Sequence, residues 1–192
     1  PSSSEASDVY KRQTQDTTTS STAITFNAEI ENSEVAWKGE VAGIYGHNGV
    51  INITEGSLSV DNGAIVGGEF VIDMTTITPT DSSYEYTEKN NPEVLTRHLS
   101  TGDFFLVDSF PTAKFIITSS EEGKVTGNLT IRDKTQSETF EVSSLEITED
   151  GATVKASLIF NRKDYGVAWV HYMQDMILSD DITIDVTLTA TK

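Results

Sequence analysis

Cysteine is absent from this chain of 192 residues, and proline occurs only 4 times. Without cysteine there is no disulfide, no thiolate nucleophile and no cysteine-based metal site, although this absence fits either redox compartment. No apolar run approaches the roughly 20 residues that a membrane-spanning helix needs, and no apolar core of a signal peptide is found. The sequence therefore argues against thiol chemistry and against a direct membrane span.

Basic residues are scarce, with 13 Lys and Arg against 30 Asp and Glu, for a formal net charge of −17. A surface this negative repels phosphate backbones, so we expect no nucleic-acid partner. It also disfavours docking on anionic lipid through charge. Any contact with lipid should therefore be apolar and enclosed.

Recognisable catalytic and metal motifs are missing as well. The histidines His47, His98 and His171 have no metal-ligand spacing, and the EF-hand pattern is absent. The chain contains no G-x-S-x-G elbow and no glycine-rich phosphate loop. We read the many carboxylates on the outward parity of strands as a solvated acidic face. The sequence predicts no catalytic residue, no metal and no cofactor.

The N-terminal residues 1–22 differ in composition from the rest. They are rich in Ser and Thr and almost free of large aliphatic residues, which predicts a disordered tail or tether. Within them, DVYKRQ (8–13) resembles the translation of a transposase sequencing adapter. We therefore hypothesise that residues 1–13 are an assembly artefact that replaced the true start of the gene, together with any export signal or lipid-attachment cysteine. The domain proper is expected at 23–192.

From residue 23 onward, apolar residues alternate with polar ones. In DITIDVTLTATK, for example, Ile182, Ile184 and Val186 share one parity, as the residues on one face of a half-buried strand do. VDNGAI, SEEGKV and TEDGAT mark hairpin turns. The alternation changes phase at Ser143-Ser144 and near Gly56, which predicts β-bulges. We count eight or nine strands, nearly all able to pair antiparallel.

One helix interrupts the strands, in NNPEVLTRHLSTG. Asn91 is a natural N-cap and Pro92 suits the first helical position. A second, shorter turn is expected near 163–168. Such an element set fits a sandwich or a closed barrel; closure removes exposed edges and leaves room for one small ligand. We favour the all-β solution, an eight-stranded antiparallel lipocalin-like barrel with one short cap helix.

The inward parity of the predicted barrel is consistently apolar. These residues either fill a core or line a cavity that selects a hydrocarbon ligand. Gly127 and Gly67-Gly68 favour a cavity, because they leave wall positions without bulk. The predicted wall consists of Phe70, Ile72, Met74, Phe115, Ile117, Leu129, Ile131, Leu158, Phe160, Ile184 and Val186.

Six motifs, taken in order, resemble the YceI family of polyisoprenoid-binding, lipocalin-like barrels. The family's most recognisable block is matched by RHLSTGDFFLVDSFPTAKF (97–115). Two departures are Tyr165, where Phe is commoner, and SSYEYTEKNNPE (82–93), a longer lead into the helix. The other matching motifs are VAWKGEV (35–41), GHNGVINITEGSLSV (46–60), GGEFVIDMTTI (67–77), GNLTIRDKTQ (127–136) and FNRKDYGV (160–167).

The resemblance implies a barrel that encloses a long isoprenoid or amphiphilic chain and is exported, to the periplasm or beyond, with a lipid anchor also compatible. It adds Trp37, Phe104 and Phe105 to the ligand-binding residues. Leu99, Phe104, Phe105 and Phe110 are then expected to form a plug and pocket floor. The predicted polar anchors are His47, Arg97, His98, Asp103 and Arg162.

Three functions remain open at this point. The first is a lipid-binding protein that sequesters or transports its ligand without catalysis. The second is an enzyme acting on a bound quinone or lipid, with His98 or His47 as general base. The third is a stress-response or interaction barrel with a filled core. An apolar barrel mouth would also allow two copies to pair as a homodimer.

Overall fold

The computed structural model describes residues 22–41, 43–171 and 177–192. Apart from Thr22, the predicted tail and the adapter hypothesis lie outside the described residues. Among the described residues, no helix is both long enough and apolar enough to cross a membrane.

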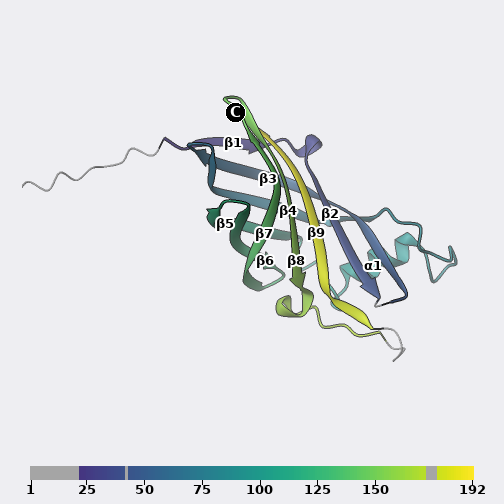
Figure 1. Cartoon of the computed structure of the whole chain (residues 1–192). Coiled ribbons are helices and arrows are strands. Elements are labelled where there is room, and N and C mark those ends of the chain that lie inside the picture. The colour runs from purple at the N-terminus through teal and green to yellow at the C-terminus, as the bar shows by residue number, and fades with distance from the viewer. Residues whose placement is uncertain (1–21, 42, 172–176) are drawn as a thin grey trace, which may run out of the picture.

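Nine strands and one α-helix make up the described chain (Figure 1). Strands predominate because β-branched and aromatic residues alternate with polar ones along most of the sequence. The strands are β1 (Ile24–Ala28), β2 (Glu34–Val41), β3 (Tyr45–Asp61), β4 (Ala64–Pro79), β5 (Thr112–Glu121), β6 (Lys124–Ile131), β7 (Lys134–Ile147), β8 (Gly151–Asn161) and β9 (Leu178–Thr191); the helices are α1 (Pro92–Ser100) and the 3₁₀ turns η1 (Ile30–Asn32) and η2 (Arg162–Tyr165).

The nine strands occupy eight positions around a closed antiparallel barrel. β1 and β2 share one position, since both pair with β3 on one side and with β9 on the other. η1 separates them. The ring then runs from β9 through β8, β7, β6, β5 and β4 back to β3. The predicted eight-stranded antiparallel barrel with one helix is confirmed.

Local sequence explains the turn between β3 and β4 and one of the irregularities. Asn62 and Gly63 both have positive φ, 49° and 77°, as the tight turn between β3 and β4 requires. The predicted bulge in β7 is confirmed by a register shift between Val142 and Ser144. The bulge predicted at Gly56 was misplaced: the shift lies between Ile53 and Glu55, and Gly56 pairs regularly with Phe70.

Helix α1 forms where its capping residues predicted it. Asn91 accepts a hydrogen bond from the backbone N–H of Val94 at 2.9 Å, and Pro92 is the first helical residue. The chain then folds back on the helix, with the N–H of Phe105 donating to the carbonyl of Leu99 at 3.0 Å. η2 confirms the shorter turn expected near 163–168. α1 and the segment after it therefore lie against one end of the barrel (Figure 1).

Candidate ligand-binding cavity

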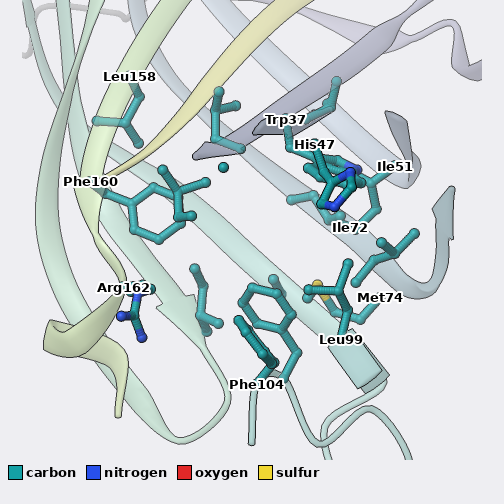
Figure 2. Close-up of a pocket in the computed structure, with 18 of the residues that line it drawn as sticks. Trp37, His47, Ile51, Ile72, Met74, Leu99, Phe104, Leu158, Phe160 and Arg162 are labelled. Atoms are coloured by element: carbon teal, nitrogen blue, oxygen red, sulfur yellow. The ribbon is translucent and has the colours of Figure 1, made fainter. Parts of the chain in front are cut away.

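A cavity of about 590 Å³ runs through the barrel interior. Its wall is built mainly from apolar side chains on alternating positions of β2 to β9 and is shown in part in Figure 2. All the residues predicted to bind ligand border it: Trp37, Phe70, Ile72, Met74, Phe104, Phe105, Phe115, Ile117, Leu129, Ile131, Leu158, Phe160, Ile184 and Val186. Strand parity correctly identified the inner face, while contact of these residues with a ligand stays a prediction.

The larger aromatic side chains lie against glycines of neighbouring strands. A Cβ added at Gly49 would sit 2.6 Å from Trp37, one at Gly56 2.6 Å from Phe70, and one at Gly127 2.5 Å from Phe115. Glycine commonly marks sites in sheets where another group approaches closely. The expectation that Gly127 leaves the wall open was therefore wrong, because the ring of Phe115 occupies that space.

The predicted floor forms in part. Phe104 is buried, packs 5.5 Å from Trp169 between ring centroids, and borders the cavity together with Leu99 and Phe105. Phe110, in contrast, does not border the cavity, and the buried Val107 from the same segment joins the core instead.

Arg132, which the sequence did not single out, holds the floor in place. Its Nη1 donates to the carbonyls of Phe104 at 3.1 Å and Gly166 at 3.4 Å. The residue follows β6 in the turn to β7, with a φ of 56°, a conformation that a non-glycine residue seldom adopts. Arg132 thereby connects the β6–β7 turn to the floor and to the end of η2.

Three of the predicted polar anchors, Arg97, His98 and Asp103, were expected to hold the plug. Only His98 and Asp103 contact each other. Nε2 of His98 lies 3.1 Å from the carboxylate of Asp103. Arg97 is exposed and has no hydrogen bond or ion pair with any described residue. One helical position turns the side chain by about 100°, which points Arg97 away from the face that carries His98. The expectation that Arg97 fixes the plug is therefore not met.

Arg162 is only 1% exposed and borders the cavity. It donates from Nη1 to the carbonyl of Val167 at 2.7 Å and from Nε to that of Ser179 at 3.0 Å, and Nη2 lies 3.4 Å from the carboxylate of Asp180. Burial lowers its pKa, and the charge of Asp180 acts in the opposite direction. These contacts connect η2 and the segment after it to the beginning of β9.

His47 belongs to a polar cluster that also includes Asp81 and Tyr84. Nδ1 of His47 lies 3.0 Å from Asp81, the hydroxyl of Tyr84 donates to the same carboxylate at 3.2 Å, and the rings of His47 and Tyr84 stack at 4.8 Å. Asp81 and Tyr84 lie next to and within the longer lead into the helix. The segment 82–93 was recognised from the sequence as longer than in the family. Because its residues show no periodic pattern, the sequence could not indicate which of their side chains lie near His47.

The carboxylate of Asp81 is held in its charged form. Burial acts to raise its pKa, but hydrogen bonds from His47 and from the backbone N–H groups of Ser83 and Asn48 outweigh burial and lower it. The pKa of Tyr84 is raised, first by burial and then by the charge of Asp81. The cluster is thus a fixed anion with its donors arranged around it.

The family match covers nearly the same residues as the barrel strands, β1 to β9. The model of the YceI-like domain matches residues 19–190. The chain belongs to the YceI-like domain family. The predicted resemblance to this family is thereby confirmed.

One relative is similar in sequence, and two solved structures are similar in fold. A UPF0312 protein of Staphylococcus aureus strain MSSA476 is 30% identical over 124 residues, 62% of this chain and 71% of that protein. Burkholderia cenocepacia BcnA has a TM-score of 0.68 at 19% identity, covering 85% of this chain and 99% of its own. A polyisoprenoid binding domain from Saccharophagus degradans, implicated in plant cell wall breakdown, has a TM-score of 0.57 at 10% identity, covering 86% and 97%. The two structural likenesses concern the fold alone.

The Asp81 carboxylate makes the stability of this YceI-like barrel dependent on acid. The pKa of Asp81 is lower in the folded protein than its ordinary value of 3.8. The carboxylate therefore stabilises the fold fully above about pH 5, and this stabilisation is lost as the pH falls through 3.8 and below. We expect Asp81→Asn to be less stable than wild type at pH 7, and the difference to shrink between pH 5 and pH 3. Urea unfolding across this range measures it. Asp181→Asn, at an exposed position, is the control, and a difference that stays constant with pH would contradict the assignment.

Proposed function

We propose that this YceI-like barrel binds a polyisoprenoid-like or other long-chain amphiphilic lipid and sequesters or transports it without covalent chemistry. The observation that carries the proposal is the apolar cavity of about 590 Å³ inside the barrel. That volume falls within the range of roughly 300–1,000 Å³ typical of small-molecule sites. The description of the Saccharophagus degradans domain as polyisoprenoid binding adds support.

The energetics suit a hydrocarbon chain. Burying each methylene group is favourable by about 0.8 kcal/mol, so a long tail binds without elaborate polar recognition. A water molecule occupies ~30 Å³ in the liquid, and a methylene group is of similar size. At that volume per carbon, the cavity of about 590 Å³ holds on the order of 20 carbon atoms, or four isoprene units. A longer chain would extend through the barrel mouth.

The cavity argues against the alternative of a filled-core interaction barrel. A solid interior would have supported that function, whereas side chains from β2 to β9 leave a continuous space between them. Within the proposal, the acidic surface keeps nucleic acid away, and the protein is exported, periplasmic or secreted, with a lipid anchor compatible. We also propose that two copies can pair as a homodimer through the apolar openings of their barrels.

Native mass spectrometry of protein purified without detergent, before and after denaturation, tests the proposal. We expect an apolar passenger that is released on denaturation and whose mass identifies its class. A barrel that carries no passenger and also refuses added twenty-carbon isoprenoids would overturn the proposed function.

A matched pair of variants on β8 sharpens the test. Ala156 is buried and borders the cavity, whereas the neighbouring Lys155 is exposed on the outer face. Ala156→Trp is expected to fill part of the cavity and to lower the lipid recovered per protein at least fivefold, while Lys155→Trp retains wild-type lipid. Passenger content and melting temperature are measured together. Equal lipid content in two folded variants would contradict binding in the barrel interior.

A further inference from the structure

The cavity wall is mainly apolar, and most of its polar residues lie near the first residues of β3, in the segment 80–91 and on α1. Tyr45, His47, Tyr84, Asn90 and His98 border the cavity there. Figure 2 shows His47 among the residues that line the cavity. An amphiphilic ligand whose tail occupies the apolar space would bring its head group to these polar residues.

Asp81 determines which nitrogen of His47 carries the proton. Oδ2 of Asp81 lies 3.0 Å from Nδ1 of His47 and accepts from the N–H of Ser83 at 3.0 Å. Oδ1 accepts from the N–H of Asn48 at 3.1 Å and from the hydroxyl of Tyr84 at 3.2 Å. An ionised carboxylate can only accept, so the hydrogen bond to His47 requires the proton on Nδ1. In the neutral ring, Nε2 then carries an acceptor lone pair.

Nε2 of His47 is free to accept a hydrogen bond. None of the described residues bonds to it, and the side chain is 20% exposed. The ring is held by stacking on Tyr84 at 4.8 Å and by an edge contact with Tyr45 at 5.3 Å. The acceptor is thus fixed in orientation before any ligand arrives, which lowers the entropic cost of binding.

Two other polar residues on the wall, Arg162 and His98, are already engaged. Arg162 uses its guanidinium on two backbone carbonyls and Asp180. Nε2 of His98 is paired with Asp103, whose side chain is 55% exposed and so does not fix the ring as a buried anion would. His47 is therefore the group best prepared to meet a ligand.

The charges around His47 decide what kind of head group fits. The Asp81 carboxylate, only 7% exposed, lies directly behind the ring. Glu40 also borders the cavity, but it is 55% exposed and paired with Lys38. Lys89 supplies a cation at the same border, but it is exposed, where water screens its charge. A phosphate would be repelled by the carboxylates, whereas an uncharged donor would not.

We propose that Nε2 of His47 is the head-group subsite of this cavity and that it accepts a hydrogen bond from an uncharged hydroxyl, as on a long-chain isoprenoid alcohol. The inference rests on the proposed function, since it requires a lipid tail in the barrel. To that function it adds the chemical class of the head group and the residue that binds it.

The test compares three probes with the same twenty-carbon tail: geranylgeraniol, its methyl ether and its monophosphate. Trp37 and Trp169 both border the cavity, so tryptophan fluorescence can report dissociation constants for all three. Wild type is expected to bind the alcohol about tenfold more tightly than the ether, as one hydrogen bond allows, and to bind the phosphate no more tightly than the ether.

Two variants remove the acceptor in different ways. His47→Phe keeps a ring to stack on Tyr84, and His47→Asn keeps a donor for Asp81 but does not reach the cavity. Both are expected to bind the ether like wild type and to lose the tenfold preference for the alcohol. Lys155→Gln, on the outer face of β8, should keep the preference. Circular dichroism of each variant establishes that it is folded.

The outcomes separate this inference from the function it rests on. Equal affinity of wild type for alcohol and ether, tighter binding of the phosphate, or a preference that survives in folded His47 variants would overturn the head-group subsite while leaving the lipid-binding barrel intact. Failure of wild type to bind any of the three probes would overturn both.

Discussion

Replacing Gly127 with alanine is expected to lower the free energy of unfolding by about 1–3 kcal/mol, the usual range for overpacking a core. The added Cβ would lie 2.5 Å from Cζ of Phe115 and would also press on the backbone carbonyl oxygen of Ile116. The ring can relieve the contact only by turning into the lumen. We therefore expect this variant to bind less lipid and to unfold at a lower urea concentration than wild type.

Gly67→Ala is the matched control. A Cβ there meets only Cβ of Ser59, at 3.8 Å, and alanine is favoured over glycine within a strand by roughly 0.5–1 kcal/mol. Urea unfolding should show Gly67→Ala at or above wild-type stability and Gly127→Ala clearly below it. If the two variants unfolded alike, the packing of Phe115 over Gly127 would not matter for stability.

Arg162→Ala is expected to destabilise the barrel by about 3 kcal/mol or more, because it leaves the carbonyls of Val167 and Ser179 without their donor and opens a space beside the cavity. For a domain of this size, that corresponds to a fall in melting temperature of roughly 6–12 °C. Differential scanning calorimetry measures the shift.

Asp180→Asn separates the ion pair from the backbone bonds of Arg162. The Asp180 side chain is 42% exposed and lies 3.4 Å from Nη2, so its charge contributes less than about 1 kcal/mol. We expect this variant to melt within a few degrees of wild type. A loss as large as that of Arg162→Ala would mean that the ion pair, and not the two carbonyl bonds, holds this end of the barrel.

The sequence predicted those features that depend on local pattern. Alternation in β9 placed Ile182, Ile184 and Val186 on the inner face, because successive side chains of a strand point to opposite sides. Likewise, Asn91 and Pro92 predicted the beginning of α1, because capping depends on the few residues around it. Fold and cavity wall followed from such signals, and the family resemblance pointed to the same barrel.

Features that depend on distant pairs were missed. Phe115 covers Gly127 because β5 pairs with β6 in one register, and alternation alone does not give the register of neighbouring strands. Asp81 meets His47 across 34 positions of sequence, from a segment without periodicity. Arg97 is an exception, because the geometry of the helix itself turns its side chain about 100° away from that of His98.

The shared position of β1 and β2 has a consequence for the order in which the barrel is made. Both strands pair with β9, Asn27 with Thr191 and Val35 with Val186, so the ring closes through contacts between residues more than 150 positions apart. Such contacts form late and slowly, because they require a long loop to close first. Until β9 is in place, the apolar inner face of β2 has no neighbour on that side and the cavity has no wall there. The proposed lipid would therefore be enclosed only after the final strand has joined, so that loading would follow completion of the fold.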